Sequence, residues 1–266
     1  TEFAQRMKND EMITLAKFLA ISGIILPMLP HKNLIPDINL TPYSIWLATV
    51  VVSGISYLSY LLKRYVFHES GTLVSGIIGG LYSSTATISV LARKSRKASE
   101  QEATEYVAAM LLAVSMMFLR FMILILIFSR EIFLSIYPYL LIMSVVSAIV
   151  GWFVHSRQKL PKDTSVESEE DDSSNPLEFK VALIFAVLFV VFTVLTHYTL
   201  VYAGTSGLNL LSFVSGFSDI TPFILNLLQN TGSVAVLIIT ACSMQAIVSN
   251  ISVSYTHLRA HETGRN

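Results

Sequence analysis

Long apolar stretches separated by short polar segments run along most of this chain of 266 residues. A bilayer core about 30 Å thick needs roughly 20 apolar residues per helix, and by that criterion the pattern predicts about eight membrane-spanning helices. Their expected limits are residues 12–29, 44–62, 72–92, 104–128, 132–154, 179–202, 207–228 and 233–253. The sequence therefore predicts an all-α fold, a polytopic membrane helix bundle.

The longest polar segment, residues 155–177, is rich in acidic and small polar side chains. Such a composition cannot bury enough apolar surface to form a core, so we expect a disordered, solvated linker. It separates a first membrane repeat, 1–154, from a second, 178–252. Residues 253–266 turn abruptly polar and resemble a translated cloning or sequencing adaptor, so we expect a non-native tail that truncates the second repeat.

The two halves resemble each other at a constant spacing of 136 residues (216 minus 80). The matched pairs are Ser70 with Ser206, Gly71 with Gly207, Gly80 with Gly216, Thr85 with Thr221 and Ile88 with Ile224. Ser115-Met116 matches Ser243-Met244 at a shorter spacing of 128 (243 minus 115). Because four expected helices separate the equivalent ones, the pattern predicts a parallel internal repeat of four plus four helices.

The composition agrees with a membrane protein, since 53% of the residues are hydrophobic, 14% are charged and the mean hydropathy is +0.62. Soluble domains carry about a quarter charged residues. The formal net charge is zero, and the basic residues fall between helices, so we expect the lipid bilayer and no nucleic acid as a partner. The single cysteine, Cys242, excludes an intrachain disulfide.

Sequence signatures of enzymes and cofactor sites are missing. The chain has no G-x-S-x-G, H-E-x-x-H or Walker A motif and no Cys/His cluster with zinc spacing. The acidic run at 169–172 could attract divalent cations, but a run without fixed geometry is usually only solvated. We therefore expect no enzyme, no cofactor and no metal site.

The stretch from residue 76 to 97 combines small residues, hydroxyls and a basic end along one apolar helix. Glycines allow a neighbouring helix to approach closely, and the glycines expected at helix contacts are Gly76, Gly79, Gly80 and, in the second half, Gly216. The hydroxyl residues lie at a depth where lipid offers no hydrogen-bond partner, and they are Ser83, Ser84, Thr85 and Thr87. The basic residues that end the segment are Arg93, Lys94, Arg96 and Lys97.

Asp219 is the one carboxylate expected inside a span, within the repeat partner of this stretch. A carboxylate at that depth costs about 2.5 to 3.5 kcal/mol, so a functional role in a cavity or beside a partner is one interpretation. The other is that Gly216 and Pro222 break the helix and Asp219 caps its second half. Both can hold, because transporters bind ions and solutes at the ends of half-helices.

A site at the repeat interface would bring the hydroxyls of residues 83–87 opposite Asp219, Thr221 and Asn226. The alternative is a tight helix interface in which the hydroxyls bond back to their own helix. Arg120 lies about 12 Å from the end of its expected helix at 1.5 Å per residue. It could snorkel to the interface or form an ion pair with Asp219.

Basic residues in short loops predict the orientation, since cytoplasmic loops carry an excess of Lys and Arg. With eight crossings, the loops after the first, third and fifth helices hold Lys32, Arg93, Lys94, Arg96, Lys97, Arg157, Lys159 and Lys162. The other side holds Arg6, Lys8, Lys63, Arg64 and Arg130. We expect the first set to be cytoplasmic, together with loop 93–103 and linker 155–177, in the inner (plasma) membrane.

Four segments together resemble a known family: LPMLP, WLATVVVSGISYLSY, GIIGGLYSSTATISVLARKSR and SGFSDITPF. They are similar to the prokaryotic membrane domain of unknown function that often follows an MgtC/SapB-type domain in one polypeptide. The resemblance covers residues 11–250 and implies a fused or neighbouring MgtC/SapB-like domain and a further C-terminal helix. It also implies a second acidic residue two positions after Asp219, where this chain has Thr221, which argues against a two-carboxylate metal site.

Two functions remain open from the sequence. The first is a transporter-like protein that moves a small solute or ion, indicated by the repeat, the broken helices and Asp219. The second is a non-transporting regulatory or assembly module that packs against its MgtC/SapB-like domain through close-packing glycines, which would also allow a homo-oligomer. We favour the transporter.

Overall fold

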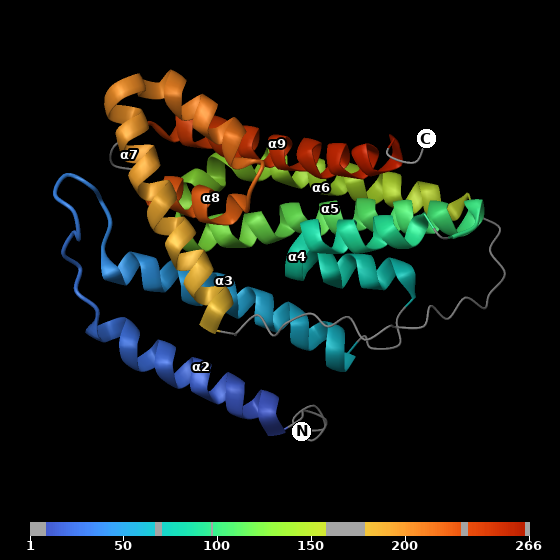
Figure 1. The fold of residues 1–266 in the computed structure, drawn as a ribbon, viewed down its shortest axis with the longest axis horizontal. Coiled ribbons are helices and arrows are strands. Elements are labelled where there is room, and N and C mark those ends of the chain that lie inside the picture. Colours follow the sequence, from blue (N-terminus) through green and yellow to red (C-terminus); the bar gives the residue numbers. More distant parts are fainter. Residues whose placement is uncertain (1–8, 67–70, 97, 158–178, 230–233, 264–266) are drawn as a thin grey trace. The chain divides into compact units, whose positions relative to one another are not determined.

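The structure is a computed structural model that describes residues 9–66, 71–96, 98–157, 179–229 and 234–263. Apart from an isolated β-bridge between Ile35 and Ile38, the regular secondary structure of these ranges is helical (Figure 1). The helices are α2 (Asn9–Met28), α3 (Pro42–Leu61) with its π-helical continuation η1 (Leu62–Val66), α4 (Thr72–Ser95), α5 (Glu100–Phe128), α6 (Arg130–Ser156), α7 (Phe179–Ser215), α8 (Ile220–Gln229) and α9 (Val236–Thr263).

Six of these helices are long and apolar enough to cross a membrane, namely α3, α4, α5, α6, α7 and α9. Two shorter apolar segments, Met12–Met28 and Ile220–Gln229, lie in α2 and α8. The predicted all-α membrane bundle is confirmed. The expected count of about eight continuous spans is not, because the chain is interrupted within α4, within α7 and between α7 and α8.

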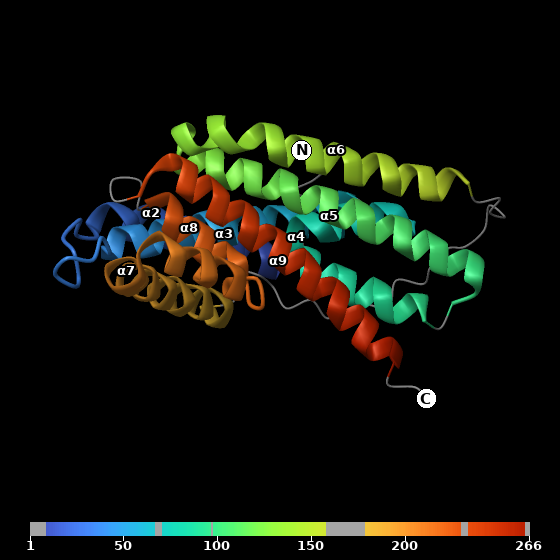
Figure 2. The same ribbon diagram turned by 90° about the horizontal axis from the view of Figure 1, so that it is seen from above.

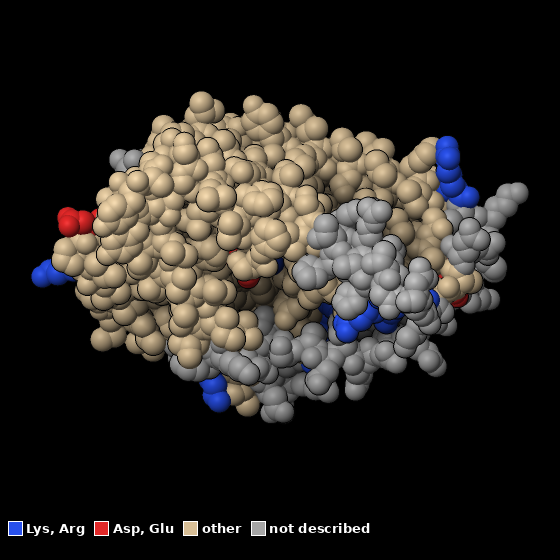
Figure 3. Space-filling model, turned by 45° about the horizontal axis from the view of Figure 1, so that its top comes forward, with Lys and Arg blue, Asp and Glu red and all other residues tan. Residues whose placement is uncertain are grey.

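The outer face of α6 indicates what surrounds the protein. Ile142, Val146, Ile149 and Phe153 recur every three or four residues, so they share one helix face, and each is more than half exposed. Large contiguous apolar patches are rare on soluble monomers. Figure 3 shows the same character over the visible surface, where uncharged residues cover most of the described part of the chain. A lipid bilayer is therefore the environment that this surface fits.

The chain forms two compact units. The first unit comprises Thr1–Gly54, Leu124–Ile136 and Pro176–Val253, and the second comprises Ile55–Ile123, Tyr137–Asn175 and Ser254–Asn266. Each unit therefore draws on both halves of the sequence. Most of the expected linker 155–177 lies outside the described residues.

In the first unit, α7 folds back sharply at Gly204. This glycine has φ 59° and ψ −151°, a region that is essentially restricted to glycine. A Cβ on Gly207 would lie 2.8 Å from Cγ2 of Thr199, although residues eight apart in a straight helix are about 12 Å apart along the axis. α7 therefore consists of a first arm, residues 179–203, and a second arm, residues 205–215 (Figure 1), which matches the two helices expected there.

α8 packs against α7 in the same unit. The rings of Phe192 and Phe223 meet edge to face at 5.6 Å, and Asn226 bonds Thr196 one turn further along both helices. The two contacts advance together, so α8 runs in the same direction as the first arm of α7. Because the second arm folds back from the first, the second arm and α8 form a helical hairpin.

In the second unit, α4 is broken at Ser83, whose φ of −157° and ψ of 101° are those of an extended strand. A Cβ on Gly79 would lie 2.8 Å from Cγ2 of Thr87, again across eight residues that a straight helix would keep about 12 Å apart. α4 is therefore a second hairpin, with a first arm of residues 72–82 and a second arm of residues 84–95 (Figure 1).

Two of the glycines expected at helix contacts close this hairpin onto α5. A Cβ on Gly80 would lie 2.6 Å from Cα of Ala113, and a Cβ on Gly76 would overlap the backbone carbonyl of Ala109. Both pairs advance by four residues, so the first arm of α4 and α5 run in the same direction at close range. Small residues on both helices allow this backbone approach.

Candidate functional site

Asp219 lies at the tip of the hairpin in the first unit, between the second arm of α7 and α8. Single-turn hydrogen bonds tighten and end the second arm, from the N–H groups of residues 216, 217 and 218 to carbonyls three residues earlier. Oδ1 of Asp219 then accepts a hydrogen bond of 2.9 Å from the backbone N–H of Thr221. Asp219 is thus the N-cap of α8, and its charge lies where the helix dipole favours an anion.

α9 supplies the other half of this tip. Nδ2 of Asn250 donates to the carbonyl oxygens of Gly216 at 3.1 Å and Ser218 at 3.4 Å, and Oγ of Ser249 donates to the carbonyl of Phe213 at 2.7 Å. These carbonyls end the second arm and have lost their helical partners. A Cβ on Gly216 would lie 2.8 Å from the backbone nitrogen of Asn250, so glycine permits the close contact.

Thr221 and Asn226 lie on α8, where every residue from Ile220 to Leu228 is buried. Nδ2 of Asn226 donates to Oγ1 of Thr196 at 3.3 Å, which ties α8 to the first arm of α7. Asp219, by contrast, is exposed. Seven residues along a helix span about 10 Å, so Asp219 and Asn226 occupy opposite ends of α8 rather than one cluster.

Ser83 has the corresponding place in the second unit. It lies at the break of α4, and its Oγ accepts a hydrogen bond of 3.4 Å from the backbone N–H of Ala86. Ser83 therefore caps the second arm of α4 as Asp219 caps α8. Of the hydroxyl residues that follow, Ser84 is buried, Thr85 is exposed and Thr87 packs against Gly79.

Arg120 of α5 contacts the same break. Its Nη1 donates to the carbonyl oxygen of Tyr82 at 2.9 Å. In an unbroken helix that carbonyl would bond the N–H of Ala86, which here bonds Ser83 instead. Arg120 therefore holds the end of the first arm, much as Asn250 holds Gly216. Its expected ion pair with Asp219 stays a prediction, as does a joint site of the hydroxyls with Asp219, Thr221 and Asn226.

Residues 50–258 match the protein family described as a domain of unknown function (DUF4010). The chain belongs to this family. No curated protein and no solved structure matches it. The resemblance to a membrane domain of unknown function is confirmed at this level, and the association with an MgtC/SapB-like domain stays a prediction. The DUF4010 match also includes residues 253–258, the start of the segment expected to be a non-native tail.

Two polar contacts of this DUF4010 chain escaped the sequence analysis. Ser249 and Asn250 form an adjacent polar pair inside an otherwise apolar helix, and that pair is the signal that could have indicated them. The loop before α3 carries Asp37 and Asn39, which approach α7 and α8 only through the fold. Within the described ranges, no group of three or more His, Cys, Asp or Glu residues is placed to hold a metal ion.

Proposed function

We propose that this protein is a transporter-like integral membrane protein that moves a small solute or ion and performs no enzymatic reaction. The observation that carries the proposal is α8, an apolar helix of ten residues that begins at a chain break capped by Asp219 and is buried along nearly its whole length. It is about 15 Å long, half of a bilayer core. Transporters bind ions and solutes at such half-helix ends within the membrane.

The internal repeat expected from the sequence fits both hairpins. The second arm of α4 begins at residue 84 and α8 at Ile220, while α5 begins at Glu100 and α9 at Val236. Both differences are 136 residues, as are those between the capping residues Ser83 and Asp219. The glycine contacts follow the same spacing, because Gly80 meets Ala113 and Gly216 meets Ser249. The shorter spacing of 128 is then unnecessary.

The hairpins change the expected symmetry of the repeat from parallel to inverted. Each hairpin enters the membrane and leaves on the same side, so it adds no crossing. Counted along the chain, α5, α6 and the first arm of α7 make three crossings between the first hairpin and the second. An odd number means that the two hairpins enter from opposite faces, as in the inverted repeats of many transporters.

The basic residues support this path of the chain. One face then carries most of the cations, namely Lys63, Arg64, Arg93, Lys94, Arg96 and Arg157, and the other carries Lys32 and Arg130. The positive-inside rule assigns the first face to the cytoplasm. Loop 93–103 and linker 155–177 keep the side expected from the sequence, whereas the loop with Lys32 moves to the outer face.

Transport by the purified full-length protein in liposomes, measured with a panel of ions and metabolites, tests the proposal. We expect flux in the wild type and a strong loss of flux in Asp219→Asn, which keeps an N-cap acceptor but removes the charge. Ser218→Ala is the matched control, since its Oγ only bonds back to Ser215. Absence of flux in the wild type, with unchanged cell phenotypes in Asp219→Asn, would overturn the proposal.

The assembly module is the weaker alternative. It relies on Gly76 and Gly80 as a surface for another protein, but both glycines pack against Ala109 and Ala113 of the same chain. A Gly80→Leu variant would therefore disturb the fold of this chain itself. Loss of partner binding in that variant would not distinguish assembly from misfolding.

A further inference from the structure

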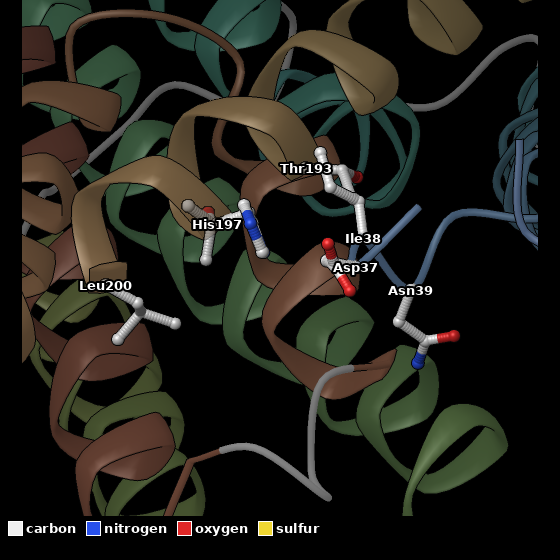
Figure 4. Close-up of a pocket in the computed structure, with 7 residues that line it drawn as sticks. Asp37, Ile38, Asn39, Thr193, His197 and Leu200 are labelled. Atoms are coloured by element: carbon white, nitrogen blue, oxygen red, sulfur yellow. The ribbon is translucent and has the colours of Figure 1, made fainter. Parts of the chain in front are cut away.

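A small cavity in the first unit lies away from the hairpin tip. Its volume is about 70 Å³, and it is lined by Asp37, Ile38, Asn39, Thr193, Thr196, His197 and Leu200 (Figure 4). The four residues from α7 are spaced by three, one and three, so they form one face of its first arm. The other three come from the loop between α2 and α3.

The loop holds Asp37 in a defined position. Asp37 has φ 64°, a left-handed conformation that only glycine and, less often, Asn and Asp adopt readily. Ile38 and Leu40 on either side of Asn39 are almost fully buried, and Nδ2 of Asn39 donates to the carbonyl of Gln229 at the end of α8 at 3.1 Å. The carboxylate of Asp37 is thus presented by an anchored turn.

Two strong metal ligands face this cavity. Figure 4 shows the carboxylate of Asp37 and the imidazole of His197 turned into it. Within the described part of the chain, neither side chain makes a hydrogen bond, so their lone pairs are unused. Oγ1 of Thr193 donates to the carbonyl of Phe189 at 2.8 Å, which leaves its oxygen lone pairs available to a cation.

The size and charge of the cavity select the ligand. One water molecule takes up about 30 Å³ in the liquid, so the cavity has room for an ion with about two waters and excludes sugars and amino acids. Asp37 is the one formally charged residue among the seven that line it, which favours a cation. Imidazole with carboxylate and hydroxyl oxygens suits first-row divalent metals better than alkali ions.

We propose that this cavity binds a first-row divalent metal ion through Asp37 and His197, with water and threonine oxygens in the remaining positions. Two strong ligands give weaker, more exchangeable binding than the three or four of a structural metal site. Thr196 joins the cavity wall to Asn226 of α8, so an ion here contacts the hairpin directly. The site goes beyond the proposed function, since binding does not require transport.

Co²⁺ absorption of the purified full-length protein in detergent tests the proposal without any flux measurement. The background carries His257→Ala and His261→Ala, because these two histidines are four residues apart and could bind Co²⁺ on a helix. We expect ligand-field bands that are lost on addition of Zn²⁺. His197→Ala and Asp37→Asn should each weaken binding by about tenfold or more, since even outer-shell partners contribute about 10- to 100-fold.

Two histidines provide matched controls. His31 lies on the same loop and stacks on Tyr43, and His155 is half-buried on α6 in the second unit; His31→Ala and His155→Ala should bind Co²⁺ as the background does. Unfolding midpoints of all variants show that they remain folded. Absence of Co²⁺ bands, unchanged binding in His197→Ala or Asp37→Asn, or displacement of Co²⁺ by equimolar Na⁺ or Mg²⁺ would each overturn the proposal.

Discussion

The side-chain amide of Asn250 donates a hydrogen bond of 3.1 Å to the carbonyl oxygen of Gly216, 34 residues earlier in the chain. This contact closes the end of the second arm of α7, where the helix stops and its carbonyls lose their partners. Water cannot replace the lost bonds inside a bilayer. A single amide on α9 therefore makes the break in the hairpin tolerable at membrane depth.

Replacing Asn250 by leucine should destabilise the protein. The change keeps the side-chain size but leaves the carbonyls of Gly216 and Ser218 without their donor, at a cost of about 1 to 3 kcal/mol. Unfolding in detergent by increasing denaturant measures the loss. Ser252→Ala is the control on the same helix, since Ser252 is exposed and bonds only its own helix; equal stability of both variants would contradict the role of Asn250.

The packing of Gly80 predicts a contrast between two glycines. In Gly80→Ala the new methyl would lie 2.6 Å from Cα and O of Ala113, and overpacking of this kind costs about 1 to 3 kcal/mol. In Gly54→Ala nothing lies within 4 Å of the new Cβ, so helix propensity should raise stability by up to about 1 kcal/mol. Thermal unfolding midpoints that shift in the same direction would refute this packing.

Gly204 predicts a cost that arises from backbone conformation alone. Nothing lies within 4 Å of a Cβ placed there, but its φ of 59° disfavours any other residue. Gly204→Ala should therefore lose about 1 to 3 kcal/mol although it creates no clash. Gly23→Ala, also in open space but at an ordinary helical φ, is the control, and a loss in both variants would point to another cause.

Cysteine labelling distinguishes the two paths of the chain. In a Cys242→Ser background, Leu34→Cys and Arg96→Cys place single thiols in the loops before α3 and before α5. The re-entrant α4 puts these loops on opposite faces, with residue 34 outside. An impermeant maleimide should label residue 34 in intact cells and residue 96 only after permeabilisation. Labelling of both under the same condition would restore eight continuous spans.

Part of the candidate site followed from the sequence. Gly216 and Pro222 indicated the break, and Asp219 was a candidate cap for its second half, because a carboxylate within an apolar run requires a partner. The donors that complete the tip did not follow. Ser249, Asn250 and Arg120 bond backbone carbonyls, and a carbonyl leaves no mark in the sequence that would identify its partner.

Hydrophobicity alone determined that this chain is an all-α membrane bundle, since apolar length and the lack of charge decide what a bilayer accepts. The tertiary structure decided which apolar runs cross it. Two arms of eleven or twelve residues have the same composition as one continuous span, so the sequence reads residues 72–92 as a single helix. Contacts across the turn, such as that of Gly79 with Thr87, make the hairpin, because only the folded chain supplies partners for the backbone groups that a break exposes.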